Sequence, residues 1–326
     1  MGMRANSDNI WHSADCEPPA AAGSTTTLDR LTPFALRARR KITHVLRDAN
    51  SVQRLTTRLD SNMCRQWCKS KFRAANGFPE ILIETTSHCN YRCPFCPQGR
   101  TPRPEAYMTD AFFQRIIDEL ADMKYRGMVA LNVNNEPLTH PHIVDFARLV
   151  SEKLPACEPL IITNGSLLTE EMFKAFLSMN NPPRLKINDY TRGHKVLARV
   201  RDYLKHLPPH LRDTDHVRLH KRSFDESMNN RAGNIPGATP KGHERQLMCM
   251  LPFRELLIAA DGTVPLCCSD YRYEAVMGDA RTQSLMEIWT GEPFAAVRRG
   301  LMESGRGAVP LCRNCTHLDL DPFDEP

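Results

Sequence analysis

Three closely spaced cysteines, directly after an apolar run, constrain this chain more than any other feature. Cys89, Cys93 and Cys96 lie in the run Thr-Ser-His-Cys-Asn-Tyr-Arg-Cys-Pro-Phe-Cys-Pro. Thiolates this close in sequence can converge on one inorganic centre. A [4Fe–4S] cluster held by three cysteines would keep one iron open, whereas a zinc ion would need a fourth ligand such as His88. Three unrelated loop cysteines are the remaining interpretation.

Length and composition narrow the class of protein. The chain has 326 residues, of which 41% are hydrophobic and 25% charged, as in ordinary globular domains. No apolar stretch reaches the roughly 18 residues of a membrane span, and the N-terminus lacks a signal-peptide pattern. Twelve cysteines without a secretion signal favour metal ligation over disulfides. We therefore expect a cytoplasmic protein with no membrane partner.

The N-terminal quarter differs from the rest in charge. Residues 1–76 contain 13 Lys and Arg against 6 Asp and Glu, whereas the whole chain has a net charge of +5. Residues 1–28 are rich in Ala, Ser, Thr and Gly and are predicted to be disordered. Residues 29–76 are predicted to form a basic helical extension, and packing on the main domain is favoured over nucleic-acid binding. Its Cys64 and Cys68 are taken as buried or free thiols.

From residue 78 onward, short apolar runs alternate with amphipathic segments. Thr109 and Thr169 are predicted N-caps, and further helices are expected at 141–154 and 194–207. The candidate strands are 80–85, 128–133, 159–163, 184–189 and 216–222. Such alternation predicts an α/β fold with a parallel sheet, an open and partial (β/α)6 TIM-like barrel. The cysteine loop would then lie at the carboxyl ends of the strands, where active sites of such sheets are found.

A second set of cysteines lies near the C-terminus, at positions 249, 267, 268, 312 and 315. Strands at 254–259 and 263–266, joined by an Asp261-Gly262 turn, are predicted to form a hairpin. Cys312 and Cys315 form a Cys-x2-Cys pair, a common chelate. On spacing alone, the set could hold zinc or a second cluster.

The first cysteine set resembles the signature of the radical S-adenosylmethionine (SAM) enzymes, Cys-x3-Cys-x2-Cys with an aromatic residue before the last cysteine. The resemblance implies that SAM chelates the open iron and yields a 5′-deoxyadenosyl radical, which abstracts a hydrogen atom. Asparagines here replace the glycines of the Gly-Gly-Glu-like turn that binds the SAM amino group. The resemblance implies cofactor binding by Phe95, Asn134, Asn135, Glu136 and Pro137. Asn164 lies in a turn that would either meet the cofactor or simply join a strand to a helix. Asn188 is added because it shares a face of its strand with Lys186, towards the barrel interior.

The second set resembles the auxiliary-cluster domain of the SPASM/twitch branch of that superfamily. The shared features are the spacing Cys-x17-Cys-x44-Cys-x2-Cys, Met277-Gly-Asp and Ile288-Trp289. The resemblance implies that Cys249, Cys267, Cys312 and Cys315 ligate an auxiliary [4Fe–4S] cluster. It also implies a radical SAM barrel over residues 77–245 and a cluster domain over residues 246–326.

The expected reaction is hydrogen abstraction from a sugar, cyclitol or similar small polar substrate, with a reducing partner such as flavodoxin or ferredoxin. In a dehydrogenation, Arg231, Lys186 or His220 would meet the substrate hydroxyl. In an epimerisation, Cys268 would return a hydrogen atom. Peptide maturation is a third outcome. A non-catalytic iron–sulfur electron-transfer protein is the alternative from another class, and Glu136-Pro137 argues against it. These choices rest on family resemblance.

Overall fold

The structure is a computed structural model that describes residues 77–212, 216–224, 229–235 and 249–317. The predicted disordered segment 1–28 and the basic helical extension 29–76, with Cys64 and Cys68, lie outside the described residues.

Six strands form one parallel sheet in the order β5-β4-β3-β2-β1-β6. In register, Leu82 pairs with Ala130 on one side and Leu257 on the other. The strands are β1 (Glu80–Ile83), β2 (Met128–Ala130), β3 (Glu158–Thr163), β4 (Arg184–Asp189), β5 (Val217–Lys221) and β6 (Glu255–Ile258). All five neighbouring pairs are parallel, so the predicted α/β partial barrel is confirmed.

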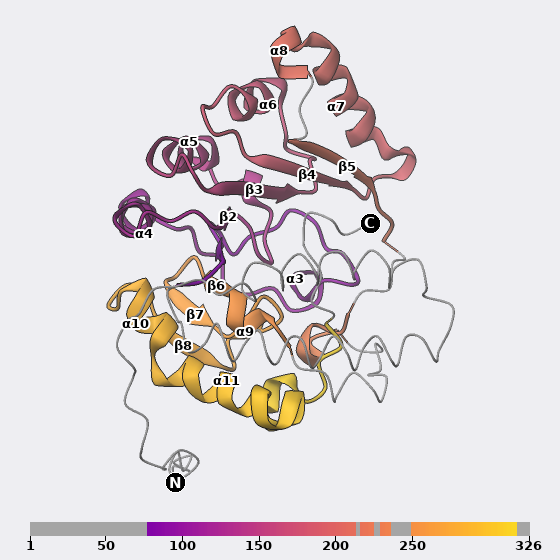
Figure 1. The fold of residues 1–326 in the computed structure, drawn as a ribbon. Helices are drawn as coiled ribbons and strands as arrows, with labels where there is room; N and C mark the ends of the chain where they lie inside the picture. The colour runs from indigo at the N-terminus through magenta and orange to yellow at the C-terminus, as the bar shows by residue number, and fades with distance from the viewer. Residues whose placement is uncertain (1–76, 213–215, 225–228, 236–248, 318–326) are drawn as a thin grey trace, which may run out of the picture.

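Helices connect successive strands and cover the outer side of the sheet, as Figure 1 shows. The predicted caps are confirmed, since Thr109 Oγ1 accepts from the Phe112 N–H and Thr169 Oγ1 from the Met172 N–H. The helices are α3 (Pro97–Arg100), α4 (Asp110–Asp122), α5 (Ile143–Lys153), α6 (Glu170–Leu177), α7 (Lys195–His206), α8 (Pro209–Arg212), α9 (Leu251–Arg254), α10 (Leu285–Thr290) and α11 (Glu292–Ser304). The 3-10 turns are η1 (Pro137–Thr139), η2 (Arg192–His194), η3 (Arg231–Gly233), η5 (Gly305–Ala308) and η6 (Pro310–Cys312).

The strands place apolar side chains on both faces of the sheet. Ile81 and Val129 belong to the large core shared with the helices, where the rings of Phe113 and Phe146 stack at 3.9 Å. The alternate residues, Leu82 among them, form a second cluster on the other face of the sheet. Burial on both faces is typical of parallel strands between crossover helices.

The predicted hairpin at 254–266 is wrong. The strand Glu255–Ile258 joins the main sheet beside β1, while β7 (Thr263–Pro265) pairs antiparallel with β8 (Val276–Asp279) in a separate ribbon. The Asp261-Gly262 turn does form, with a φ of +91° at Gly262. All four residues of β6 are buried, so this strand needs cover on both faces, which a two-stranded hairpin would not supply.

The C-terminal helices α10 and α11 pack beside β8 at the opposite end of the molecule from α8 (Figure 1). Arg298 of α11 is buried between the rings of Trp289 and Phe294, and its Nε–H donates to the carbonyl of Pro252. Helix α4 meets this region through Glu119, whose carboxylate accepts from the Leu285 N–H at 2.6 Å. In the described part of the chain, no helix is long and apolar enough to cross a membrane.

Candidate active site

A cavity of about 250 Å3 opens at the carboxyl ends of the strands and extends into the barrel. At its inner end, Arg254 pairs with Glu80 at 2.5 Å. The lining includes most of the predicted site, namely Cys89, Cys93, Phe95, Cys96, Asn134, Asn135, Glu136, Asn164, Lys186, Asn188, Arg231 and Cys268. The fold thus gathers residues from all parts of the described barrel around one space.

The three cysteines lie in a tight loop between β1 and α3. The Cys96 N–H donates to the Cys93 carbonyl at 3.1 Å, and α3 begins at Pro97. A Cβ on Gly99 would lie 2.4 Å from the Cys93 carbonyl oxygen, so only glycine allows this close return of the backbone. Burial raises the pKa of the Cys89 thiol to about 11 and that of Cys93 to about 12. Binding of a metal centre therefore displaces protons from these thiols.

The geometry gives no support to a zinc ion at either cysteine set. Across the described residues, no group of three or more His, Cys, Asp or Glu side chains is placed to hold a single metal ion. Tetrahedral zinc would bring its ligand sulfurs to within about 4 Å of one another, given Zn–S bonds of about 2.3 Å. A [4Fe–4S] cluster stands between its ligands, so its cysteines need not approach one another as closely as zinc ligands do.

Glu136 is an acidic residue of the cavity that several hydrogen bonds hold in place. Its carboxylate accepts from Thr163 Oγ1 at 2.6 Å, from the Asn164 N–H at 2.7 Å and from the Leu138 N–H at 3.1 Å. Its backbone N–H donates to the carbonyl of His88 at 3.0 Å, beside the cysteine loop. Burial raises the pKa of this carboxyl to about 7 although the three hydrogen bonds oppose the rise. Glu136 therefore ties the ends of β2 and β3 to the cluster loop.

The neighbouring asparagines leave polar atoms unused inside the cavity. Asn134 Nδ2 donates to the Cys268 carbonyl at 2.9 Å, and Asn135 Oδ1 accepts from the Val133 N–H. Asn135 Nδ2 and Asn188 Oδ1 are buried and have no hydrogen-bond partner among the described residues. Buried polar atoms normally have hydrogen-bond partners, so the Asn135 donor and the Asn188 acceptor are available to bind a ligand. The predicted Pro137 begins η1 and does not line the cavity.

An aromatic group forms one wall of the cavity. Phe95 and Tyr190 line the cavity with ring centroids 5.5 Å apart, and Phe224, which does not line it, lies 5.7 Å from Tyr190. Asn164 acts within the protein, since its Nδ2 donates to Asn90 Oδ1 and its Oδ1 accepts from Ser166. These contacts hold the turn after β3 against the cysteine loop.

Arg231 reaches the cavity from a strained loop. Arg231, Ala232 and Gly233 have φ angles of +47°, +54° and +93° in succession. Asn230 fixes the loop to the C-terminal segment, where its N–H donates to Thr316 Oγ1 at 2.8 Å. Left-handed φ angles at the two non-glycine residues, Arg231 and Ala232, are costly, so the surrounding contacts must hold Arg231 in place.

Of the other residues predicted to contact substrate, two line the cavity and one does not. Lys186 lines the cavity and is 2% exposed, whereas His220 is not among the lining residues. Cys268 also lines the cavity, and its N–H donates to Glu255 Oε1 at 2.9 Å. Burial, followed by the nearby Glu255 carboxylate, raises the pKa of the Cys268 thiol well above its usual range.

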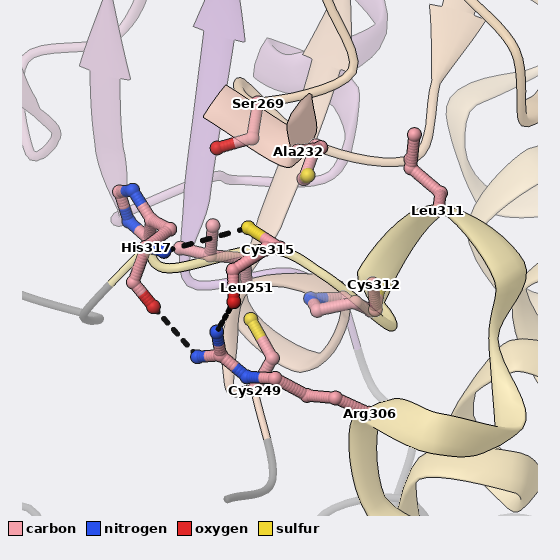
Figure 2. A pocket seen from close by; sticks show the side chains of 11 residues that line it. Ala232, Cys249, Leu251, Ser269, Arg306, Leu311, Cys312, Cys315 and His317 are labelled. Carbon is pink, nitrogen blue, oxygen red and sulfur yellow. Dashed lines mark hydrogen bonds between the residues drawn. The ribbon is translucent and has the colours of Figure 1, made fainter. Parts of the chain in front are cut away.

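A second cavity, drawn in Figure 2, is lined by Cys249, Cys267, Cys312 and Cys315. Leu251 and His317 line both cavities, so they form part of the wall between them. The sequence did not single out three further lining residues, Ser269, Arg306 and His317. Their types and spacings carry no motif, so no signal along the chain could have found them.

Comparison with known families identifies the chain. Residues 83–204 match the model of the radical SAM superfamily, and residues 249–316 match the SPASM iron–sulfur cluster-binding domain. The chain belongs to the radical SAM superfamily, in its SPASM branch. It is a radical SAM oxidoreductase, and its cofactors are SAM and [4Fe–4S] clusters.

Individual relatives agree with this assignment. The chain is 26% identical over 249 residues to the S-adenosyl-L-methionine-dependent 2-deoxy-scyllo-inosamine dehydrogenase of Niallia circulans, which covers 76% of this chain and 96% of that protein. It is 30% identical over 153 residues to the tungsten-containing aldehyde ferredoxin oxidoreductase cofactor-modifying protein of Pyrococcus furiosus, over 44% of this chain and 41% of that protein.

Solved structures share the fold. The structure of BtrN in complex with AdoMet and 2-DOIA superposes with a TM-score of 0.64 and 24% identity, over 74% of this chain and 94% of that one. An open conformation of BtrN gives a TM-score of 0.57 at 22% identity, over 74% and 93% of the two chains. These likenesses support a partial barrel followed by a small C-terminal cluster domain.

Proposed function

We propose that this protein is a radical SAM dehydrogenase that oxidises a carbinol of a sugar, cyclitol or similar small polar molecule. The observation that carries the proposal is the arrangement of two cysteine-lined cavities with Leu251 and His317 in the wall between them. One site can start a radical reaction, and the other can receive an electron. The dehydrogenase of Niallia circulans, named for a cyclitol amine, supports this substrate class by analogy.

Each cavity has residues suited to its cofactor. Cys89, Cys93 and Cys96 would hold the open cluster, while the unsatisfied amides of Asn135 and Asn188 would bind SAM. The aromatic wall around Phe95 offers a face for its adenine ring. The four cysteines of the second cavity would hold the auxiliary cluster. We retain residues 77–245 and 246–326 as the proposed extents of the two domains, with β6 of the second segment completing the sheet of the first.

When bound, SAM and its cluster supply the 5′-deoxyadenosyl radical that removes the carbinol hydrogen atom. The resulting substrate radical becomes a ketone by losing the hydroxyl proton and one electron. Arg231 would donate hydrogen bonds to the oxygen that becomes the carbonyl, because a guanidinium is a donor and a poor base. The buried Lys186 is the candidate base that would accept the hydroxyl proton. The electron would go to the auxiliary site across the wall at Leu251 and His317.

Epimerisation is the second candidate, and the position of Cys268 favours it. Its side chain lines the substrate cavity, whereas the adjacent Cys267 lines the auxiliary one. A thiol there could return a hydrogen atom to the opposite face of the substrate radical, leaving a thiyl radical to be reduced. The cavity of about 250 Å3 suits a small molecule better than a peptide.

The physiological setting follows from the redox chemistry. The reaction needs a low-potential electron donor, for which flavodoxin or ferredoxin is the proposed partner. A cytoplasmic location is part of the same proposal.

The test is a reaction in deuterated water with a panel of sugars, aminocyclitols and their phosphates. A dehydrogenase yields one 5′-deoxyadenosine per ketone, with no solvent deuterium at the reacting carbon. An epimerase yields an inverted carbon that carries deuterium, and Cys268→Ala abolishes that product. Cys157→Ala is the matched control, because Cys157 is a buried thiol outside both cavities. Absence of any product across this substrate class would refute the proposed function.

A further inference from the structure

The second cavity contains a buried positive charge. Arg306 is 2% exposed, and its guanidinium donates from Nη1 to the Cys315 carbonyl at 3.0 Å and from Nη2 to the His317 carbonyl at 2.7 Å. It forms no ion pair with any carboxylate in the described ranges, and its buried Nε–H has no hydrogen-bond partner there. A buried charge is costly unless an opposite charge compensates it.

A second buried donor lies in the same cavity. The side chain of Ser269 is 0% exposed, and its hydroxyl has no hydrogen-bond partner within the described part of the protein. Ser269 and Arg306 line the same cavity as Cys249 and Cys315, and Figure 2 draws all four side chains around it. Buried hydroxyls are almost always hydrogen-bonded, so an acceptor is missing at this place.

One ligand would satisfy both residues. An iron–sulfur cluster with four thiolate ligands is anionic, and its sulfurs accept hydrogen bonds. It would supply the acceptor for Ser269 and the counter-charge for Arg306. The residues of the second cavity therefore suit an iron–sulfur cluster in their charge and hydrogen bonding as well as in the spacing of their cysteines.

We propose that Ser269 and Arg306 raise the reduction potential of the auxiliary cluster, Ser269 by a hydrogen bond to a cluster sulfur and Arg306 by its positive charge. Hydrogen bonds to the sulfurs and local charge are established determinants of cluster potentials. Both residues favour the reduced cluster, which carries one more negative charge. This inference rests on the auxiliary cluster of the proposed function.

The consequence is a directed electron step. The substrate radical loses one proton and one electron to become the ketone, and the auxiliary cluster takes up that electron. A raised potential makes the site a better acceptor, which favours oxidation over return of a hydrogen atom. Ser269 and Arg306 would thus bias the enzyme towards dehydrogenation without touching the substrate.

The main test is an EPR-monitored redox titration of the anaerobically reconstituted full-length chain. Signals of the two clusters are separated by adding SAM, which perturbs only the cluster that it binds. Ser269→Ala is expected to lower the auxiliary midpoint potential by about 59 mV, a tenfold change in the one-electron equilibrium constant. Ser304→Ala is the matched control, because Ser304 is exposed and lines neither cavity; it should leave both potentials unchanged.

The role of the Arg306 charge is tested with two substitutions, one that removes the positive charge and one that keeps it. Arg306→Gln should lower the auxiliary potential, whereas Arg306→Lys, which keeps the charge, should lower it less. If a variant fails to fold, a measurement on the unaltered protein still tests the hydrogen bond from Ser269. Protein reconstituted in normal and in deuterated water should show, by ENDOR, an exchangeable proton coupled to the reduced auxiliary cluster in addition to that of the His317 N–H, which donates to Cys315 Sγ at 3.4 Å.

The outcomes separate the inference from the proposed function. Iron content near eight per chain with an unchanged potential in Ser269→Ala, or without the additional coupled proton in the unaltered protein, overturns the role of Ser269 alone. Equal potentials in Arg306→Gln and Arg306→Lys overturn the role of Arg306. Iron content near four per chain removes the auxiliary cluster and with it the proposed electron acceptor.

Discussion

A buried ion pair between Arg103 and Glu84 lies near the cysteine loop, and its removal should destabilise the protein in a pH-dependent way. Arg103 donates to the carboxylate of Glu84 at 2.5 Å, and the two side chains are 12% and 1% exposed. The guanidinium lies 4.7 Å from the ring centroid of Tyr271 and 4.6 Å from that of Tyr273. Tyr271 in turn hydrogen-bonds Gln98, two residues after Cys96.

Arg103→Met removes one partner and leaves the Glu84 carboxylate buried. Breaking a buried pair in this way costs about 3–5 kcal/mol, and the two ring contacts add about 1–2 kcal/mol. With a urea m-value of about 3 kcal/mol/M, the unfolding midpoint should fall by about 1 M or more. In Glu84→Gln/Arg103→Met both charges are gone, so we expect the double variant to regain much of this loss.

The stability loss of Arg103→Met should depend on pH, because it involves the ionisation of Glu84. Burial raises the pKa of Glu84 in the folded protein, and Arg103 opposes the rise. Without Arg103 the folded pKa rises further above the unfolded value, so the folded state binds more protons than the unfolded state. Stability is then lost as pH increases above the unfolded pKa of Glu84. The deficit of Arg103→Met should be small near about pH 5 and larger near about pH 8.

The assay is anaerobic urea unfolding of the cluster-loaded chain, followed by far-UV circular dichroism at both pH values. Arg148→Met is the control, because its pair with Asp145 is exposed and should contribute little. Equal midpoints for Arg103→Met and the unaltered protein, or a deficit that is the same at both pH values, would refute this reasoning.

Three further predictions concern the two sites. Cys312→Ala should lower the iron content from about eight to about four per chain while 5′-deoxyadenosine still forms, as shown by iron counting and chromatography. Asn188→Ala should weaken SAM binding about tenfold in equilibrium dialysis, since a donor of SAM would lose the buried Asn188 Oδ1 as its acceptor, whereas the exposed Asn180→Ala should not. Because the pKa of Glu136 rises to about 7 on folding, stability falls as pH rises from 4.5 to 7, and Glu136→Gln should reduce that fall in urea unfolding.

The sheet was predictable from sequence because its strands are apolar runs separated by amphipathic segments with clear caps. The strand 255–258 was assigned to the wrong partner. The Asp261-Gly262 turn favoured a local hairpin, but the four buried residues Glu-Leu-Leu-Ile suit a parallel strand between two covered faces. The prediction of the turn was correct, but the prediction of the strand's partner was not. Which sheet edge is open to a sixth strand is decided only when the whole sheet has assembled.

The proposed cysteine ligands could also be named from the sequence, because metal chelation imposes fixed spacings. The roles of Ser269 and Arg306 were not, because an unsatisfied donor is recognised only when every possible partner has been placed in space. The Glu136 network is an intermediate case. Its position after β2 was expected, but the three protein donors on its carboxylate show that it organises the loops as well as facing the cavity.

The central claim is that the three cysteines after β1 start a radical reaction with SAM. The most direct test is the amount of 5′-deoxyadenosine formed from SAM by the reconstituted, anaerobically reduced chain. The account predicts its formation by the unaltered protein and its loss in Cys93→Ala, while Cys157→Ala retains it. No 5′-deoxyadenosine from the unaltered protein, with the clusters present and reduced, would contradict the account.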